Sequence, residues 1–390
     1  MEERRKRHVA VLMEVIAPFS FATAGRIRFG RGVAGDAADA ARAYGRRVLI
    51  LRGGSVAWVD ELCRELTAAG CDVTEVRSSG EPSVDDVRSA VAAGRGAQVV
   101  LGVGGGAVID LAKAAAALIP SDCDVMEHLE VVGAGKPLQA DPLPMIAVPT
   151  TAGTGAEVTK NAVIAVPKAA RKVSLRDDRM LPRLALVDPA LTDGAPRGVT
   201  LGSGLDALVQ VIEPYLSNKA SPLSDALCRA AIPQGIAALK RLAHGEDKAA
   251  RDAMAYVSLS GGLALANAGL GAVHGLAGVI GGRFGAPHGL ICGRLLGPVL
   301  AANSNALGAS VRFSEVQRWL VEGFDLPKTG TFDALAALPD DWGLDRLGRW
   351  IPEGTDLGET AHEAAASSSM RANPCVLSQD ALETCIRAAL

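Results

Sequence analysis

The chain has 390 residues, with 40 Lys and Arg against 43 Asp and Glu, so its formal net charge is −3, and 49% of its residues are hydrophobic. This length allows one large or two ordinary domains with a buried core, which excludes a small disulfide scaffold. The balanced charge excludes bulk disorder and a strongly basic nucleic-acid binder. No nucleic-acid partner is therefore expected.

The first half of the chain alternates short β-branched runs with alanine-rich helical stretches. The patterns predict strands at 47–51, 72–77, 98–103 and 145–148, and helices at 58–69, 84–93 and 107–118. Strands that alternate with helices of this length form parallel βαβ units. The N-terminal half is therefore predicted to be an α/β domain that binds a nucleotide.

From about Thr200 onward the β-branched runs stop, and long stretches rich in Ala, Leu and Gly follow with a helical period, as at 206–217 and 225–242. The second half is therefore predicted to be all-helical. Pro and Asp residues cluster where the first sequence pattern gives way to the second. We therefore predict an α/β domain at 1–195 and a helical domain at 196–390. A cleft between two such domains is a usual place for a ligand.

The cysteine pattern and the apolar segments bear on location. The seven cysteines are scattered and include no CxxC pair, so neither a disulfide framework nor a zinc site made of thiolates is favoured. No signal-peptide pattern follows the basic cluster at 4–7. Residues 257–282 lack Asp, Glu, Lys and Arg, but eight of them are glycine, so close helix packing explains the segment better than a membrane span. We expect a cytoplasmic protein without a membrane partner.

A glycine-rich turn follows the predicted strand at 98–103. It contains Gly104, Gly105 and Gly106 and leads into a helix that carries Asp110 and Lys113. Glycines let a pyrophosphate approach the backbone, and the N-terminus of the helix offers free N–H groups. The alternative is a turn that serves tight packing only. The dinucleotide fingerprint also belongs to the first βα turn of a domain, whereas this turn follows the third strand.

A second polar loop follows the predicted strand at 145–148. Thr150, Thr151 and Thr154 offer hydroxyl groups that can bind the phosphates, ribose or amide of a cofactor. The alternative is a turn whose hydroxyl groups only cap a helix.

Two histidines lie in glycine-rich, uncharged surroundings, at His274 and His288. On one straight helix they would be roughly 21 Å apart, so a shared metal ion requires a chain reversal, which the glycines and proline at 281–287 can supply. Asp206, on a helix that we expect to open at 202–205, and Gln210 one turn later lie on one helix face. Two His and one Asp form a common Zn²⁺ or Fe²⁺ site with an open position. The alternative is that both histidines are ordinary core or surface residues.

Taken together, these motifs resemble the iron-containing (type III) alcohol dehydrogenase family. The resemblance rests on seven segments in family order, which cover nearly the whole chain: GGGAVIDLAK at 104–113, PTTAGTGAEVT at 149–159, DPALT at 188–192, GLDAL at 204–208, HGLA at 274–277, PHG at 287–289 and SSSMRANP at 367–374. The resemblance implies a Rossmann-like N-terminal domain, a helical C-terminal domain, NAD or NADP in the cleft, and at least a homodimer.

The resemblance also implies a divalent metal, Fe²⁺ or Zn²⁺, held by Asp206, His274 and His288. Two departures from the family pattern stand in this sequence. Gln210 occupies the position of a fourth ligand that is usually histidine, and an amide oxygen binds iron more weakly than an imidazole does. Gly278 occupies the position of a further histidine, which removes an obvious proton relay.

The residues that the resemblance assigns to the cofactor lie in the two loops and after the first predicted strand. They are Gly53, Ser55, Gly104, Gly105, Gly106, Asp110, Thr150, Thr151 and Thr154. Lys172 stands where similar sequences place a catalytic lysine in the cleft, although a surface lysine is the alternative. Arg52, with no acid beside it, favours the 2′-phosphate of NADP unless it is a solvated strand end.

The predicted function is NAD(P)-dependent interconversion of a small alcohol and an aldehyde or ketone. One alternative is a metal-independent reduction of an oxo-acid, as in the related maleylacetate reductases, with Arg283, Arg294 or Arg371 binding the carboxylate. Another is a lyase similar to dehydroquinate synthase, which recycles NAD. A protein that binds partners without catalysis is the last alternative.

Overall fold

The N-terminal half contains a six-stranded parallel sheet in the computed structural model, which describes residues 16–54 and 56–390. The strand order is β1-β8-β5-β4-β2-β3. The strands are β1 (Ile27–Phe29), β2 (Arg47–Gly53), β3 (Asp72–Ser78), β4 (Val99–Gly104), β5 (Met145–Pro149) and β8 (Leu184–Val187). Ser55 and the basic cluster at 4–7 lie outside the described residues.

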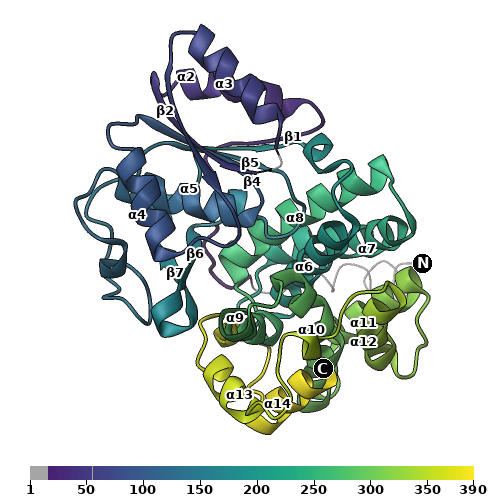
Figure 1. Cartoon of the computed structure of the whole chain (residues 1–390). Helices are drawn as coiled ribbons and strands as arrows, with labels where there is room; N and C mark the ends of the chain where they lie inside the picture. The colour runs from purple at the N-terminus through teal and green to yellow at the C-terminus, as the bar shows by residue number, and fades with distance from the viewer. Residues whose placement is uncertain (1–15, 55) are drawn as a thin grey trace.

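Helices cover both faces of this sheet (Figure 1). They are α2 (Ala37–Arg42), α3 (Trp58–Ala68), α4 (Val84–Ala93) and α5 (Gly106–Leu118). Successive side chains of a strand point to opposite faces. Val48 and Ile50 pack with α2 and α3, whereas Leu49 and Leu51 pack with α4 and α5. The predicted strands and helices agree with the structure to within two residues, and the predicted α/β fold is confirmed.

An antiparallel hairpin that the sequence analysis did not predict lies between β5 and β8. It consists of β6 (Asn161–Val166) and β7 (Arg171–Arg176). Strand β6 contacts α5, and β7 contacts a helix of the C-terminal half, α9 (Ala272–Phe284). The hairpin therefore joins the sheet domain to the helices.

The second half is helical, as predicted. Besides α9 it contains α6 (Arg197–Leu216), α7 (Pro222–His244), α8 (Lys248–Ala268), α10 (His288–Leu307), α11 (Val311–Phe324), α12 (Thr331–Asp341), α13 (Leu357–Ala365) and α14 (Gln379–Ala388). Helix α6 contacts α7, α8 and α10 and is buried along most of its length, so it forms the centre of the largest apolar core.

The start of α6 differs from the expectation. The helix begins at Arg197 rather than at 202–205, and Gly202 and Gly204 lie inside it. The two glycines are tolerated there because neighbouring helices pack against them, so tertiary packing overrides their poor helix propensity. Strand β8 ends at Val187 and α6 begins at Arg197, and the boundary predicted at 195/196 lies between them.

Residues 257–282 belong to two helices, α8 and α9, which meet at a bend of 100°. Within residues 16–54 and 56–390, no single helix is long and apolar enough to cross a membrane. Within the same residues, only this bent pair meets both criteria, and only when its two helices are counted together. The expected close helix packing is present, because Gly261 of α8 lies against Gln210 of α6.

Candidate active site

The two predicted cofactor loops lie side by side at the carboxyl ends of the sheet strands. Strands β4 and β5 are parallel neighbours, and the backbone N–H of Thr150 donates to the carbonyl of Gly104 over 2.9 Å. A Cβ atom at Gly106 would overlap the side chain of Thr154, so this close approach requires glycine. The N-terminus of α5 and the loop that carries Thr150, Thr151 and Thr154, here called the threonine loop, thus form one surface of N–H groups and hydroxyl groups.

The same surface faces the helical half. A small pocket is lined by Thr150 and Thr151 on one side and by Ser203 and Gly204 of α6 on the other. Gly53 ends β2, which pairs with β4, so it lies at the same end of the sheet. The two halves therefore meet beside the predicted cofactor loops.

Asp110 and Lys113 are engaged in holding the fold together. The Asp110 carboxylate accepts a hydrogen bond from the backbone N–H of Val163 over 2.9 Å and lies 3.0 Å from Lys113 Nζ. Burial raises the pKa of Asp110, and the charge of Lys113 opposes this increase. Lys113 also donates to the hydroxyl of Thr159 over 2.8 Å. These contacts fix the hairpin to α5, so the predicted ribose contact of Asp110 has to compete with them.

Arg52 does not fit either interpretation of the sequence. It is 2% exposed, so it is not a solvated strand end. Its guanidinium group pairs with Asp60 and lies 3.7 Å from Glu75. The argument for NADP that rested on a free Arg52 is therefore wrong, because two carboxylates already neutralise this charge.

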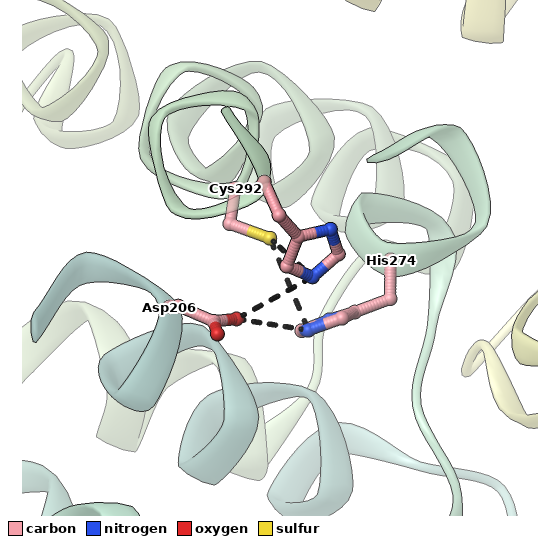
Figure 2. A group of neighbouring side chains, drawn as sticks. Asp206, His274 and Cys292 are labelled. Carbon is pink, nitrogen blue, oxygen red and sulfur yellow. Dashed lines mark hydrogen bonds and ion pairs between the residues drawn. The ribbon is translucent and has the colours of Figure 1, made fainter. Parts of the chain in front are cut away.

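The predicted metal ligands converge from three helices (Figure 2). Asp206 Oδ1 of α6 lies 3.2 Å from Nε2 of His274 on α9 and 3.8 Å from Nε2 of His288 on α10. The sulfur of Cys292, also on α10, lies 3.6 Å from His288 Nε2 and 3.9 Å from His274 Nε2. These four ligand atoms all lie within 4.8 Å of one another, so the donor set suits a divalent metal ion.

The predicted chain reversal brings the two histidines together. Helix α9 ends at Phe284, Gly285 takes a φ of +71°, and α10 begins at His288, so the two imidazole centroids lie 5.4 Å apart. Helices α6 and α10 cross so closely that a Cβ atom at Gly289 would overlap the backbone carbonyl of Gly202. This contact brings the Asp206 carboxylate next to the imidazoles.

Glu213 orients the first histidine. Its carboxylate accepts hydrogen bonds from Nδ1 of His274 and from the backbone N–H of Val273, each over 2.7 Å. A proton held on Nδ1 leaves Nε2 with its lone pair directed toward Asp206. Glu213 lies two turns after Asp206 on α6, so one helix provides both a ligand and the group that orients another.

The charges of the cluster favour a bound cation. Burial lowers the pKa values of both imidazoles, but the contacts with Cys292 and the nearby carboxylates outweigh it, and they raise the pKa of His288 to about 9 and that of His274 well above its usual value. Burial raises the pKa of Asp206, and the hydrogen bond from His274 and the charges of both imidazoles bring it below its usual value. A divalent ion among these atoms would supply the positive charge in place of protons.

Gln210 joins the cluster to the cofactor loops. Its amide nitrogen donates to the carbonyl of Gly153, in the threonine loop, over 3.0 Å. Its amide oxygen, the atom that could bind a metal, is buried and has no hydrogen-bond partner within the described part of the chain. Gln210 therefore fixes the position of the metal-binding helix relative to the threonine loop.

Cys292 is the residue that the sequence analysis missed. A CxxC pair marks metal ligands that are close along the chain, whereas this thiol belongs to a group of possible ligands from three helices. One signal was available, because Cys292 lies four residues after His288 and so on the same face of a helix. The lack of CxxC pairs disfavours a zinc site made of thiolates, but it does not exclude a single cysteine such as Cys292 in a mixed group of possible ligands.

Lys172 lies near the cluster's second helix without joining the cluster. It is on β7, pairs with Glu81, and its Nζ lies beside Gly281 of α9. Two of the arginines suggested for an oxo-acid are already paired. Arg283 contacts Glu363 over 2.9 Å, and the buried Arg294 contacts Asp340 over 2.7 Å.

Family models match both halves of the chain. The model described as iron-containing alcohol dehydrogenase matches residues 24–189, and the model for the C-terminal part of the Fe-containing alcohol dehydrogenase family matches residues 200–390. The chain belongs to the iron-containing alcohol dehydrogenase family. The resemblance indicated by the motifs is thus confirmed, and with it the predicted enzyme class and the expectation of a nicotinamide cofactor.

Individual relatives agree with this assignment. The chain is 35% identical over 321 residues to a protein named Probable alcohol dehydrogenase EutG of Escherichia coli, covering 80% of this chain and 79% of the relative. It is 33% identical over 267 residues to an NAD-dependent methanol dehydrogenase of Bacillus methanolicus, covering 67% of this chain and 68% of the relative. A sulfoacetaldehyde reductase structure from Bifidobacterium kashiwanohense, in complex with NAD+, is 27% identical, with a TM-score of 0.82 over 96% of this chain and 99% of that one.

Proposed function

We propose that this iron-containing alcohol dehydrogenase interconverts a small alcohol and an aldehyde or ketone, using NAD or NADP and a divalent metal ion. The convergence of Asp206, His274 and His288 from three helices is the observation that carries the proposal. The contact between Gln210 and the threonine loop supports it, because it fixes α6, which carries Asp206, against the surface that we assign to the cofactor.

We assign the cofactor to the carboxyl ends of strands β4 and β5. The glycines at 104–106 and the N-terminus of α5 would bind the pyrophosphate, and Gly53 would lie beside it. Thr150, Thr151 and Thr154 would contact the nicotinamide half. Asp110 stays in this set for the neighbouring ribose.

The protein side chains have separable roles in the reaction. Asp206, His274 and His288 would hold a divalent metal ion, with Gln210 as a weak additional ligand, and the ion would supply Lewis acidity toward the substrate oxygen. A bound nicotinamide would supply the hydride acceptor for oxidation of the alcohol, and the hydroxyl proton would have to reach solvent. Gly278 has no side chain to carry that proton, so water or a ribose hydroxyl would move it. Lys172 remains a proposed catalytic lysine of the cleft.

The three ligand side chains differ in their exposure to solvent, and this arrangement suits a small substrate. The side chain of His288 is 33% exposed, whereas those of Asp206 and His274 are 3% and 6% exposed. A substrate would therefore approach from the side of His288, while the other two ligands are shielded from water.

Nicotinamide absorbance is the test. We expect it to change when the purified protein is mixed with NAD or NADP and small alcohols, aldehydes or ketones, and elemental analysis of the same sample should find a divalent metal. Product formation without a net absorbance change would indicate a lyase instead. Full activity in chelated, metal-free protein, restricted to oxo-acids, would indicate the maleylacetate-reductase type. Arg283 and Arg294 are already paired with carboxylates of the protein, which argues against a reductase of oxo-acids.

The proposal includes two properties of the whole enzyme. The seven cysteines are all free thiols, which supports a reducing cytoplasm. Strand β1 is an edge strand with Phe29 half exposed, which supports assembly as a homodimer or larger homo-oligomer.

A further inference from the structure

We propose that the thiolate of Cys292 is the fourth ligand of the metal ion, and that it makes the site selective for zinc over iron. This inference rests on the proposed metal site of Asp206, His274 and His288. It adds a ligand that the motifs did not contain, and it identifies the ion.

The distances match a zinc site with four protein ligands, at which a substrate oxygen would enter as a fifth. Zinc bonds of about 2.0–2.1 Å to nitrogen or oxygen and about 2.3 Å to sulfur place neighbouring ligand atoms roughly 3.3–3.6 Å apart at tetrahedral angles. The imidazole nitrogens of His274 and His288 lie 3.2 and 3.8 Å from Asp206 Oδ1, and 3.9 and 3.6 Å from the sulfur of Cys292. Small shifts of the side chains would place all four atoms around one ion.

The position of the thiol is set by the fold and not by chance packing. Cys292 lies one turn after His288, so both side chains leave the same face of α10, and both reach Asp206 of α6. The sulfur is fully buried and directed at two imidazoles. Cys228, also fully buried, belongs to the large apolar core of the helical half. Two buried thiols of one chain thus have different surroundings, and only Cys292 lies among metal-binding atoms.

Ligand chemistry then favours zinc. Soft thiolate ligands select zinc, whereas an ordinary non-haem iron site uses imidazole and carboxylate ligands. One carboxylate and one thiolate also balance the double charge of the ion. Gln210, whose amide nitrogen is bonded to Gly153, offers only a weak neutral oxygen, so the thiolate is the stronger candidate for the fourth position.

X-ray absorption at the zinc edge of the unmodified, zinc-loaded protein tests the ligand directly. We expect one sulfur at about 2.3 Å together with nitrogen and oxygen at about 2.0–2.1 Å. A coordination shell of nitrogen and oxygen alone would overturn the inference. This measurement needs no variant, so it does not depend on how a substitution folds.

Variants test the selectivity. Cys292→Ser should lower the ratio of zinc affinity to Fe²⁺ affinity at least about tenfold, as measured by competition with a chromogenic chelator. The cobalt-loaded variant should also lose the sulfur-to-cobalt charge-transfer band of the unmodified protein. The matched control Cys228→Ser should retain both properties. An unchanged affinity ratio and spectrum in Cys292→Ser would contradict the inference.

Failure of the inference is distinguishable from failure of the proposed function. Zinc bound without sulfur, but lost in His274→Ala, would overturn the role of Cys292 and leave the proposed metal site intact. Zinc bound with sulfur, in a protein that changes nicotinamide absorbance with no alcohol or carbonyl compound, would support the role of Cys292 and refute the proposed function.

Discussion

Two clusters of buried ionisable groups lie on either side of the cofactor loops, and they are organised differently. In the cluster on α5, Lys113 contacts Asp110 and the hydroxyl of Thr159, so its charge is paired within the fold. In the cluster of the helical half, four potential ligand atoms converge on a common centre, from Asp206, His274, His288 and Cys292. We infer that pairing of the first kind marks a structural cluster, and convergence of the second kind marks a binding site.

Loss of a ligand should have the largest effect. His274→Ala should remove the bound metal and lower kcat on the order of 100- to 1,000-fold, because the substrate oxygen loses its electrostatic stabilisation. Metal analysis and steady-state kinetics check this. His128 is a buried histidine outside the cluster, with Nδ1 bonded to the carbonyl of Lys136, and His128→Ala should keep its metal. A His274→Ala protein with unchanged metal content and kcat would refute the site.

Breaking the structural cluster should affect stability instead. Lys113→Met leaves Asp110 buried without its cation, so the free energy of unfolding should fall by about 3–5 kcal/mol. The surface pair of Lys240 with Asp325 is the control, and Lys240→Met should cost less than about 1 kcal/mol. Denaturant unfolding measures both values. Metal loss from a folded Lys113→Met protein would show that the two clusters are not separate.

Glu157, buried near Lys113, should make stability depend on pH. Burial raises its pKa to about 7, partly opposed by its own backbone N–H and by Lys113. Between about pH 4.5 and 7 the folded state holds a proton that the unfolded state has lost, so the free energy of unfolding falls as the pH rises through this window.

The sign of this effect can be checked with Glu157→Gln, which cannot ionise. Relative to this variant, the unmodified protein should lose up to about 3 kcal/mol of stability between about pH 4.5 and 7, with little further change above that range. Unfolding curves measured at several pH values give the difference. Parallel pH profiles for the two proteins would mean that Glu157 is ionised in the folded state throughout.

The smallest of these effects is expected at Glu213, which contacts a ligand and not the ion. Glu213→Gln should lower metal affinity about 10- to 100-fold, because the imidazole of His274 loses its anionic partner. Chelator competition measures this, with Glu315→Gln as a control, since Glu315 contacts Tyr215 and Arg229 instead. An unchanged affinity would show that Val273 and the helix backbone orient His274 without Glu213.

Strands β2, β4 and β5 followed from the sequence because each is a short apolar run that is buried on both faces of the sheet. Strand β6 of the hairpin was missed because it carries apolar residues on both faces, whereas β7 does alternate polar and apolar residues, so its signal was present in the sequence. Val163 is 39% exposed, so the alternation of polar and apolar residues that marks a half-buried strand is absent from β6.

The site was predictable only in part. Geometry required a chain reversal between His274 and His288, and the motifs indicated Asp206. The partners of Arg52 and the role of Cys292 depend on contacts between different elements: Asp60 is on α3, Glu75 is on β3, and Cys292 completes a set from three helices. Local sequence patterns do not specify such contacts, although the spacing of four residues places His288 and Cys292 on one face of a helix.

Anomalous X-ray diffraction from crystals of the metal-loaded enzyme with NAD or NADP tests the central claim most directly. The account predicts a single anomalous peak between Oδ1 of Asp206 and the Nε2 atoms of His274 and His288, next to the nicotinamide ring. A peak at another position, or none in protein shown by elemental analysis to contain the metal, would contradict it.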